Sequence, residues 1–346
     1  MIILGIETSC DETAVSIVKA EGDLDSLSFK ILGSAIHSQI ATHREFGGVV
    51  PMLAKREHLK NLPIVYQTTL TKSGISENEI DIIAVTIGPG LEPALWTGIK
   101  FAENLGKTWG KPVIPTNHML GHIASILFNN RKMVFPALAL LISGGHTELI
   151  IMKDWKIKEK IGETKDDAVG EAFDKVARML GLPYPGGPEI SKLATKAREE
   201  NLTSIYKLPR PMIHSKDLNF SFSGLKTSVL YLLKDLGTVN EEQKKMVARE
   251  FEDAVTETLI AKTKSAIKKY SPKTLIVGGG VIANKHLREN LLQIKNDYPS
   301  LEILIPESHL ATDNATMITA AGYIEYLRNG KETNKLQANG NLELEN

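Results

Sequence analysis

Residues 2–18 read Ile2-Ile3-Leu4-Gly5-Ile6-Glu7-Thr8-Ser9-Cys10-Asp11-Glu12-Thr13-Ala14-Val15-Ser16-Ile17-Val18, two apolar runs on either side of a polar turn. This pattern predicts a β-hairpin whose turn exposes hydroxyls and carboxylates. A similar unit recurs at 137–151, with a strand at Ala137–Ile142, a turn at 143–147 and a return strand at Leu149–Ile151. Alternating elements follow each hairpin, so we expect an α/β protein of two related halves with a cleft between them.

Glycine-rich loops follow two further apolar strands. Ile82–Ile87 runs into Gly88-Pro89-Gly90, with a helix expected from about Pro93, and Thr274–Val277 runs into Gly278-Gly279-Gly280. Glycines between a strand and a helix let the backbone approach a ligand, although ordinary turns use them as well. Neither loop matches the dinucleotide-binding fingerprint or the P-loop, so neither a Rossmann dehydrogenase nor a Walker ATPase is expected.

Two histidines lie one helical turn apart in Asn117-His118-Met119-Leu120-Gly121-His122. Positions i and i+4 share a helix face, so both imidazoles can point at one cation. The zinc-protease motif places a glutamate directly after its first histidine, where this chain has Met119. The spacing favours a metal that grips a substrate over one that hydrolyses a peptide, while two unrelated helical histidines remain the alternative.

Composition indicates a globular enzyme without a membrane span. The chain has 346 residues, 42% of them hydrophobic and 24% charged, which suggests two domains of comparable size. No apolar run approaches the roughly 20 residues that a span requires. The single cysteine, Cys10, excludes an internal disulfide and fits a reducing compartment, so we expect a cytoplasmic protein.

The overall charge does not indicate nucleic acid, because Lys plus Arg and Asp plus Glu both total 41. A nucleic-acid substrate would need a local basic patch or a partner that supplies one. Residues 206–226 are a candidate patch, since basic and aromatic side chains alternate there and single-stranded RNA is bound by phosphate contacts plus stacking. Its members are Tyr206, Lys207, Arg210, Lys216, Phe220, Phe222 and Lys226. A solvated charged face would look the same.

Further carboxylates lie near predicted helix ends. A helix over 170–177 contains Asp174 and is stopped by the Pro- and Gly-rich loop 182–188. Near the end, Ile303–Ile305 is a predicted strand, and Thr312-Asp313-Asn314-Ala315 opens a last helix. Thr312 or Asp313 could cap that helix. Asp313 is equally a third metal ligand if the fold brings it to the histidines.

These motifs together resemble one family. The matching segments, in order, are Gly5–Thr13, Gly47–Pro51, Gly88–Leu91, His118-x-x-x-His122, Ser143–Thr147, Gly170–Lys175, Phe220–Thr227 and Thr312–Asn314. This set is similar to the tRNA N6-adenosine threonylcarbamoyltransferase family, called TsaD in bacteria, over about residues 2–325. The resemblance is specific, because eight separate motifs occur in the family's order.

The resemblance implies a fold and an activity. The fold is the actin-like ATPase (ASKHA) fold, with an N-terminal lobe at 1–135 carrying the histidine motif and a C-terminal lobe at 136–330. Residues 331–346 are polar and expected to be disordered. The implied activity is transfer of the threonylcarbamoyl group from threonylcarbamoyl-AMP to N6 of adenosine 37, in tRNAs reading codons that begin with A.

The resemblance also implies site residues, each matched to the family's motifs. His118, His122 and Asp313 would bind the metal. The adenylate would contact Leu141, Ile142, Ser143, Gly144, Gly145, Asp174, Gly187 and Asn284. Two departures are visible, since Met52 and Leu120 stand where many bacterial relatives have Glu. Two histidines and an aspartate suit Fe(II) and Zn(II) alike, and the resemblance favours one Fe(II) per subunit.

Chemistry suggests roles for the first turn. The acyl donor is already activated and N6 is a weak nucleophile, so positioning and polarisation of the carbonyl should carry much of the catalysis. Asp11 and Glu12 are candidates to accept the N6 proton, with capping of the hairpin turn as the alternative. His146 receives no role.

The resemblance implies partners besides tRNA and threonylcarbamoyl-AMP: the inactive paralogue TsaB and the small P-loop ATPase TsaE. Three other functions stay open at this point. A non-enzymatic scaffold such as the metal-free paralogue would lack the set of His118, His122 and Asp313. A small-molecule kinase of the same fold would use the glycine loops for ATP, and a metalloprotease would need the glutamate that Met119 replaces.

Overall fold

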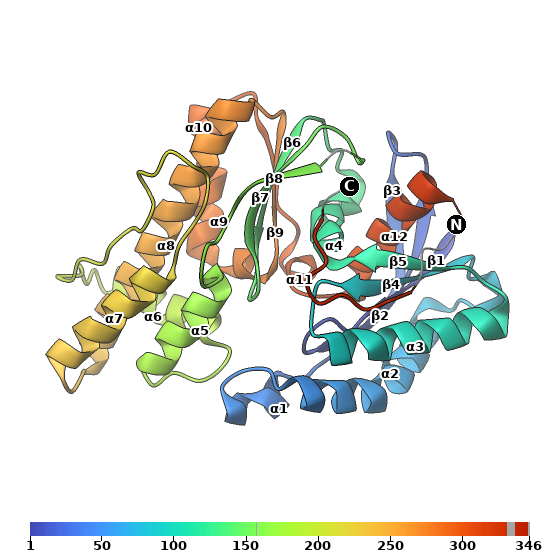
Figure 1. Ribbon diagram of the computed structural model, residues 1–346, viewed down its shortest axis with the longest axis horizontal. Helices are drawn as coiled ribbons and strands as arrows, with labels where there is room; N and C mark the ends of the chain where they lie inside the picture. The colour runs from blue at the N-terminus through green and yellow to red at the C-terminus, as the bar shows by residue number, and fades with distance from the viewer. Residues whose placement is uncertain (157, 331–335, 345–346) are drawn as a thin grey trace. The chain divides into compact units, whose positions relative to one another are not determined.

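The computed structural model describes residues 1–156, 158–330 and 336–344, and the chain divides into two compact units. Unit 1 comprises Met1–Met133, Trp155–Lys158 and Pro306–Asn346, and unit 2 comprises Val134–Asp154 and Glu159–Ile305. Both units are α/β (Figure 1). Among the described residues, no helix has the length and apolar character needed to cross a membrane.

Unit 1 is built on a five-stranded sheet in the order β3-β2-β1-β4-β5. β1 pairs antiparallel with β2 and parallel with β4. The strands of unit 1 are β1 (Ile2–Glu7), β2 (Glu12–Glu21), β3 (Ser28–Ser38), β4 (Ile82–Gly88) and β5 (Val113–Asn117). Its helices are α1 (Ile40–His43), η1 (Arg44–Phe46), α2 (Pro51–Ser73), η2 (Glu77–Glu79), α3 (Glu92–Trp109), α4 (His118–Ala124), η3 (Ser125–Asn130), α11 (Ser308–Ala311) and α12 (Ala315–Asn329).

Unit 2 repeats this topology with the order β10-β9-β6-β7-β8. β6 pairs antiparallel with β7 and parallel with β9, as β1 does with β2 and β4. The strands of unit 2 are β6 (Ala137–Ile142), β7 (Thr147–Met152), β8 (Lys158–Glu163), β9 (Thr274–Gly278) and β10 (Glu302–Leu304). Its helices are α5 (Val169–Met179), α6 (Gly186–Glu199), α7 (Ser223–Leu236), α8 (Glu241–Tyr270), η4 (Gly280–Ala283), α9 (Lys285–Leu292) and α10 (Ile294–Asp297).

The shared strand order confirms the predicted duplication. Both hairpins form where the sequence predicts them, and the two sheets are the duplicated α/β lobes expected of the actin-like ATPase fold. The strand alternation is explained by burial: Leu4, Ile6 and Val85 face a core shared with α2 and α3, while their neighbours face the opposite side of the sheet.

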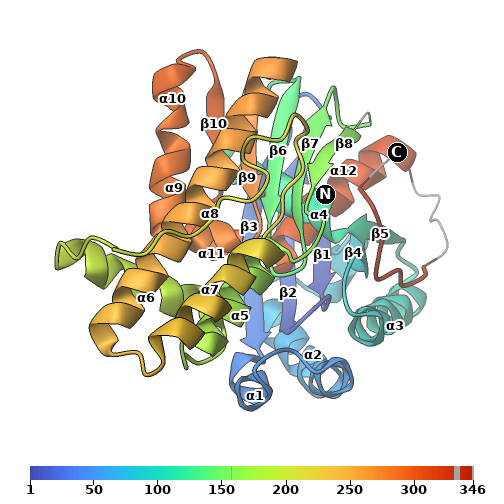
Figure 2. The same cartoon turned by 60° about the vertical axis from the view of Figure 1, so that its left-hand side comes forward.

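α12 covers that opposite face of the unit 1 sheet, as Figures 1 and 2 show. The helix approaches closely because two glycines leave room. A Cβ on Gly5 would lie 2.6 Å from the Ala315 carbonyl oxygen, and one on Gly322 would lie 2.3 Å from the Ala84 Cβ.

The second boundary of the expected C-terminal lobe, 136–330, is wrong. The chain returns to unit 1 at Pro306, so α12 belongs to unit 1.

The segment 336–344 packs on unit 1. The Asn339 N–H donates to the Ile87 carbonyl at 2.8 Å, and the Gly340 carbonyl accepts from the Gly90 N–H at 3.1 Å. Leu336 and Ala338 join the core beneath α2 and α3. Disorder is therefore a wrong expectation for 336–344, and the rest of the predicted tail, 331–335 and 345–346, lies outside the described residues.

Removal of this segment should destabilise unit 1. A chain ending before Leu336 loses the two backbone hydrogen bonds and the apolar contacts, so we expect the free energy of unfolding to fall by roughly 1–3 kcal/mol. Thermal unfolding of this truncation measures the effect, with a chain ending at Leu344 as the control. Equal melting temperatures for the two truncations would contradict it.

Candidate metal centre and adenylate loop

The helix α4 presents the two histidines of the sequence motif. Its N-cap is Asn117, whose side-chain oxygen accepts from the N–H groups of Met119 and Leu120 at 2.8 and 3.2 Å. The Asn117 amide also donates to the Glu343 carbonyl at 3.1 Å, which ties the cap to the segment 336–344. The Asn117 side chain therefore caps the start of α4 through its oxygen and bonds to the segment 336–344 through its nitrogen.

Asp313 joins the histidines, as the second of the two open alternatives for this residue predicts. Its Oδ1 lies 3.4 Å from Nε2 of His118 and 3.2 Å from Nε2 of His122. One ligand atom from each of the three residues lies within 4.8 Å of the others. The cap of α12 is Asn314, which accepts from the Met317 N–H at 2.9 Å, so a capping role for Thr312 or Asp313 is wrong.

The donor set fits a cation. Both ring nitrogens of His122 are buried: Nδ1 has no hydrogen-bond partner among the described residues, although buried polar atoms are rarely left so, and Nε2 faces Oδ1 of Asp313 at 3.2 Å. Two imidazole nitrogens and a carboxylate oxygen converge, as in sites for Fe(II) or Zn(II) with open coordination positions. Burial lowers the pKa of His122, which favours the neutral imidazole that binds metal.

Glu7 is a site residue that the sequence reasoning missed. Its carboxylate is fully buried and its Oε2 lies 2.9 Å from Nδ1 of His118. Burial raises the pKa of the Glu7 carboxyl, but the charge and hydrogen bond of His118 outweigh burial and lower it overall. Burial likewise opposes the charged form of His118, yet Asp313 and Glu7 raise its pKa well above the usual value. The available signal was a glutamate ending an otherwise apolar strand.

The turn bearing Asp11 and Glu12 adjoins the histidines within unit 1, since the Ser9 hydroxyl lies 3.2 Å from Nδ1 of His118. Asp11 is buried, and its carbonyl accepts from the Gln39 N–H at 2.9 Å. Burial and the neighbouring charge of Asp11 raise the pKa of Glu12 to about 10. Burial and Asp11 therefore favour the neutral form of Glu12.

In unit 2, the expected adenylate residues lie where several elements begin or end. Leu141 and Ile142 end β6, and the Ser143 hydroxyl accepts from the N–H groups of Gly145 and His146 at 3.3 and 3.1 Å. A Cβ at either Gly144 or Gly145 would meet nothing within 4 Å, so this loop leaves open space. The start of α5 packs against the loop, since the Gly170 N–H donates to the Ser143 carbonyl at 3.2 Å.

The remaining members of that set lie on neighbouring helices of unit 2. Asp174 of α5 accepts from the Gly186 N–H at 2.6 Å and so holds the start of α6, where Gly187 follows. Asn284 caps α9 by accepting from the Leu287 N–H at 2.9 Å, and its amide donates to Glu252 at 2.6 Å. The Asn284 side chain is thus already engaged at both ends, which the sequence could not reveal.

The family model for tRNA N6-adenosine threonylcarbamoyltransferase (TsaD) matches residues 30–320. A curated relative of that name from Thermosipho melanesiensis is 48% identical over 93% of this chain and 94% of its own. Another from Paraburkholderia xenovorans is 46% identical over 95% and 93%. The chain belongs to the tRNA N6-adenosine threonylcarbamoyltransferase family.

Solved structures support the fold. The structure of T. kodakarensis HypF aligns with a TM-score of 0.62 at 12% identity, over 95% of this chain and 48% of that chain. Component A of the Acidaminococcus fermentans (R)-2-hydroxyglutaryl-CoA dehydratase aligns with a TM-score of 0.52 at 13% identity, over 94% and 98%. At these identities the likeness shows the actin-like fold and nothing about activity. As a member of its own family, the chain is an acyltransferase.

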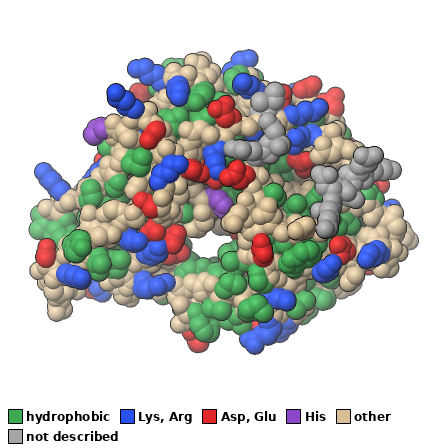
Figure 3. Space-filling view, in the orientation of Figure 1, with side chains coloured by type: hydrophobic (Ala, Val, Ile, Leu, Met, Phe, Trp, Pro, Cys, Tyr) green, Lys and Arg blue, Asp and Glu red, His purple; other side chains and the backbone are tan. Residues whose placement is uncertain are grey.

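Several side chains of the basic and aromatic segment 206–226 are engaged within unit 2, whereas Lys207 and Lys216 are exposed, so the RNA surface that its sequence suggests stays a prediction. Phe220 and Phe222 are fully buried and stack on each other at 6.3 Å between centroids. Arg210 pairs with Glu250 and Glu257 at 2.5 and 2.8 Å. Lys226 likewise pairs with Asp167 at 2.7 Å. The two phenyl rings and the charges of Arg210 and Lys226 therefore make their contacts within unit 2. Basic and acidic side chains lie interspersed on the face drawn in Figure 3.

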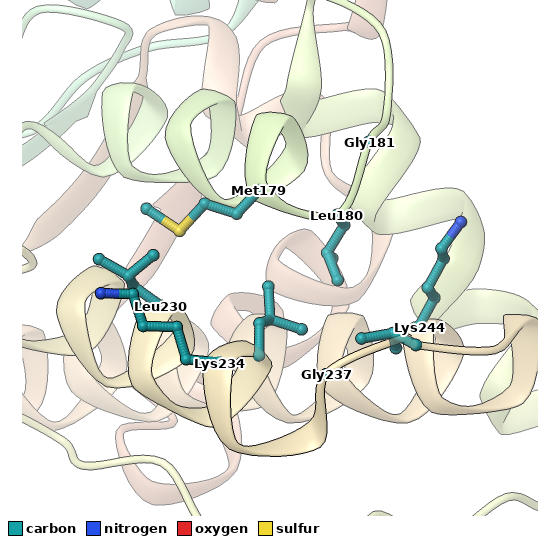
Figure 4. Close-up of a pocket in the computed structure, with 9 residues that line it drawn as sticks. Met179, Leu180, Gly181, Leu230, Lys234, Gly237 and Lys244 are labelled. Carbon is teal, nitrogen blue, oxygen red and sulfur yellow. The ribbon is translucent and has the colours of Figure 1, made fainter.

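A separate hollow of about 480 Å³ opens in unit 2 between the ends of α5 and α7 and the start of α8 (Figure 4). Its lining includes the apolar side chains of Met179, Leu230 and Leu233 and the two basic side chains of Lys234 and Lys244. None of the expected adenylate residues lines it, so this hollow is distinct from the glycine loop.

The metal centre makes a first functional prediction. We expect His122→Ala to weaken metal binding by at least about 100-fold, because two ligands hold a cation poorly against water. Elemental analysis of the purified protein and titration of the metal-free chain measure it. His214→Ala, which removes an exposed histidine elsewhere, should bind metal like the unmodified chain. Full metal content in His122→Ala would exclude the site.

Proposed function

We propose that this chain transfers the threonylcarbamoyl group from threonylcarbamoyl-AMP to N6 of adenosine 37, in tRNAs reading codons that begin with A. The observation that carries the proposal is the convergence of His118, His122 and Asp313 beside the turn of Asp11, in a chain of this family. N6 attacks the carbamoyl carbon, the carbon–oxygen bond to the phosphate breaks, AMP leaves, and N6 loses one proton.

The proposed metal is Fe(II), one per subunit, with Zn(II) also suited to the donors. His118, His122 and Asp313 would hold it. A bound cation of this kind supplies Lewis acidity that polarises an acyl oxygen. The chain's own contribution is to keep the two imidazoles and the carboxylate converged and largely buried, where charge interactions are strong.

The proposed adenylate site is the glycine loop of unit 2, formed by Leu141, Ile142, Ser143, Gly144 and Gly145, with Asp174, Gly187 and Asn284. The open space at Gly144 and Gly145 supports close approach of a ligand to the backbone. Because Asn284 is engaged as a cap and by Glu252, its contribution would be to hold the start of α9. An acyl-adenylate carries one phosphate, which needs little cationic compensation.

A substitution that fills the open space tests this loop. Gly144→Val should weaken binding of a non-hydrolysable threonylcarbamoyl-adenylate analogue at least about tenfold, because side-chain atoms would occupy the ligand's position. Calorimetry on the purified chain measures it. Gly48→Val is the matched control, since a Cβ at Gly48 also meets nothing within 4 Å but lies in unit 1. Equal affinities for the two variants would move the adenylate site elsewhere.

Asp11 is the proposed proton acceptor of the pair Asp11 and Glu12. Because burial and Asp11 raise the pKa of Glu12 and so favour its neutral form, Glu12 is suited to donate a hydrogen bond and orient Asp11. A carboxylate at Asp11 would take the N6 proton as the new bond forms.

The two acidic residues should therefore respond differently to amide substitution. Asp11→Asn removes the acceptor and should lower kcat by about 10²–10⁴-fold, whereas Glu12→Gln keeps a neutral donor and should cost less. Single-turnover transfer with saturating adenylate measures both. Metal and adenylate affinities serve as controls and should not change. A larger loss in Glu12→Gln than in Asp11→Asn would reverse the assignment.

The proposed partners are tRNA, TsaB and TsaE, and the proposed location is the cytoplasm. A tRNA substrate follows from the family. With a net charge of zero and Arg210 and Lys226 paired within unit 2, we propose that a partner supplies part of the tRNA surface. A protease is not supported, because Met119 and Leu120 leave no carboxylate between the two histidines.

Mass analysis of tRNA nucleosides tests the function as a whole. The chain is incubated with unmodified tRNA, threonylcarbamoyl-AMP and the two partner proteins. We expect N6-threonylcarbamoyladenosine and an equal amount of AMP. Absence of the modified nucleoside together with phosphate transfer from ATP to a sugar would favour the kinase alternative.

A further inference from the structure

Hydrogen bonds to both of its oxygens hold the Glu7 carboxylate in one orientation. Its Oε1 accepts from the Ser9 N–H at 2.5 Å, and its Oε2 accepts from the Thr86 hydroxyl at 2.7 Å. Glu7, Ser9 and Thr86 are all buried. A carboxylate fixed in this way presents its remaining acceptor capacity in a single direction.

That direction is Nδ1 of His118, which lies 2.9 Å from Oε2 of Glu7. An ionised carboxylate can only accept, so Nδ1 must carry the proton. The opposite nitrogen, Nε2, faces Asp313 at 3.4 Å. A neutral imidazole with its proton on Nδ1 has its free electron pair on Nε2, which is the atom turned toward the other two ligands.

His122 has no comparable support. Its Nδ1 has no hydrogen-bond partner among the described residues, and its Nε2 faces Asp313 at 3.2 Å. Its ring meets that of His118 edge to face, with centroids 4.7 Å apart, so the orientation of His118 also sets the packing of His122. One carboxylate thereby influences both rings.

We propose that Glu7 is the positioning residue of the metal centre, acting through His118 by fixing its tautomer and ring orientation for binding through Nε2. The inference rests on the proposed metal site and goes beyond it, because it assigns a role to a residue that would not touch the metal. Carboxylates that accept from a metal-bound histidine typically strengthen metal binding 10–100-fold.

The test measures Zn²⁺ affinity of the full chain after removal of metal with a chelator. Competition with a chromophoric chelator is compared for the unmodified chain, Glu7→Gln and Ser16→Ala. Ser16 is the matched control, since its buried hydroxyl on β2 bonds to the Thr316 hydroxyl at 3.0 Å and to the Gly33 carbonyl at 3.3 Å, neither of which belongs to the proposed ligands or to Glu7. We expect Glu7→Gln to bind Zn²⁺ about 10–100-fold more weakly and Ser16→Ala to bind within about twofold of the unmodified chain.

A second comparison separates positioning from general support of the fold. In a His118→Ala background, Glu7→Gln should cause no further loss of affinity, because its route to the metal is gone. An equal loss in both backgrounds would overturn the proposal. If Glu7→Gln does not fold, Thr86→Val carries the test, since it removes only the hydroxyl that orients Glu7. An affinity for Zn²⁺ equal to that of the unmodified chain would then overturn the proposal.

The failure of this inference differs from failure of the metal site itself. If the unmodified chain binds Zn²⁺ and His122→Ala does not, the site stands, and unchanged binding in Glu7→Gln overturns only the role of Glu7. If the unmodified chain and His122→Ala bind Zn²⁺ alike, the site and this inference both fall.

Discussion

The concentration of charge inside unit 1 is the constraint on which its site depends. Glu7 and Asp313 are carboxylates on either side of His118, in a region where an unpaired charge would cost several kcal/mol. Without metal, one imidazolium can offset only one of the two negative charges. A divalent cation with neutral imidazoles would balance both. The local charge count therefore favours a bound cation over an empty site.

The rest of unit 1 keeps these groups converged. α12 approaches the sheet through Gly5 and Gly322, and this close packing brings the chain segment before it, with Asp313, to α4. Asn117 caps α4 and is bonded in turn to the segment 336–344. Elements distant in sequence thus fix three ligands whose own local geometry is unremarkable. The long-range contacts, more than the histidine spacing, make the site.

The sequence predicts local features well and long-range ones poorly. Both hairpins, the helix of His118 and the glycine turns follow from periodicity and turn residues, which are local properties. The return of α12 to unit 1 does not follow from the periodicity of residues 315–329, and only the expected grouping of Asp313 with the histidines pointed to it. The pairing of Arg210 in the segment 206–226 was hidden for the same reason, since Glu250 and Glu257 lie a helix away in sequence. The sequence shows Glu7 at the end of an apolar strand but does not reveal its contact with His118.

The two units are alike in topology yet differ in what the ends of their first strands carry. In unit 1, β1 ends in Glu7 and leads into hydroxyl and carboxylate side chains; in unit 2, β6 ends in Ile142 and leads into Ser143 and two open glycines. The first arrangement suits a cation and a proton, and the second suits a ligand that lies against backbone. The proposed acyl transfer from an adenylate would use both kinds of surface. It does not need the lysine of a P-loop, because no phosphoryl group moves. Duplication of one fold, followed by different residues at equivalent turns, is sufficient to supply them.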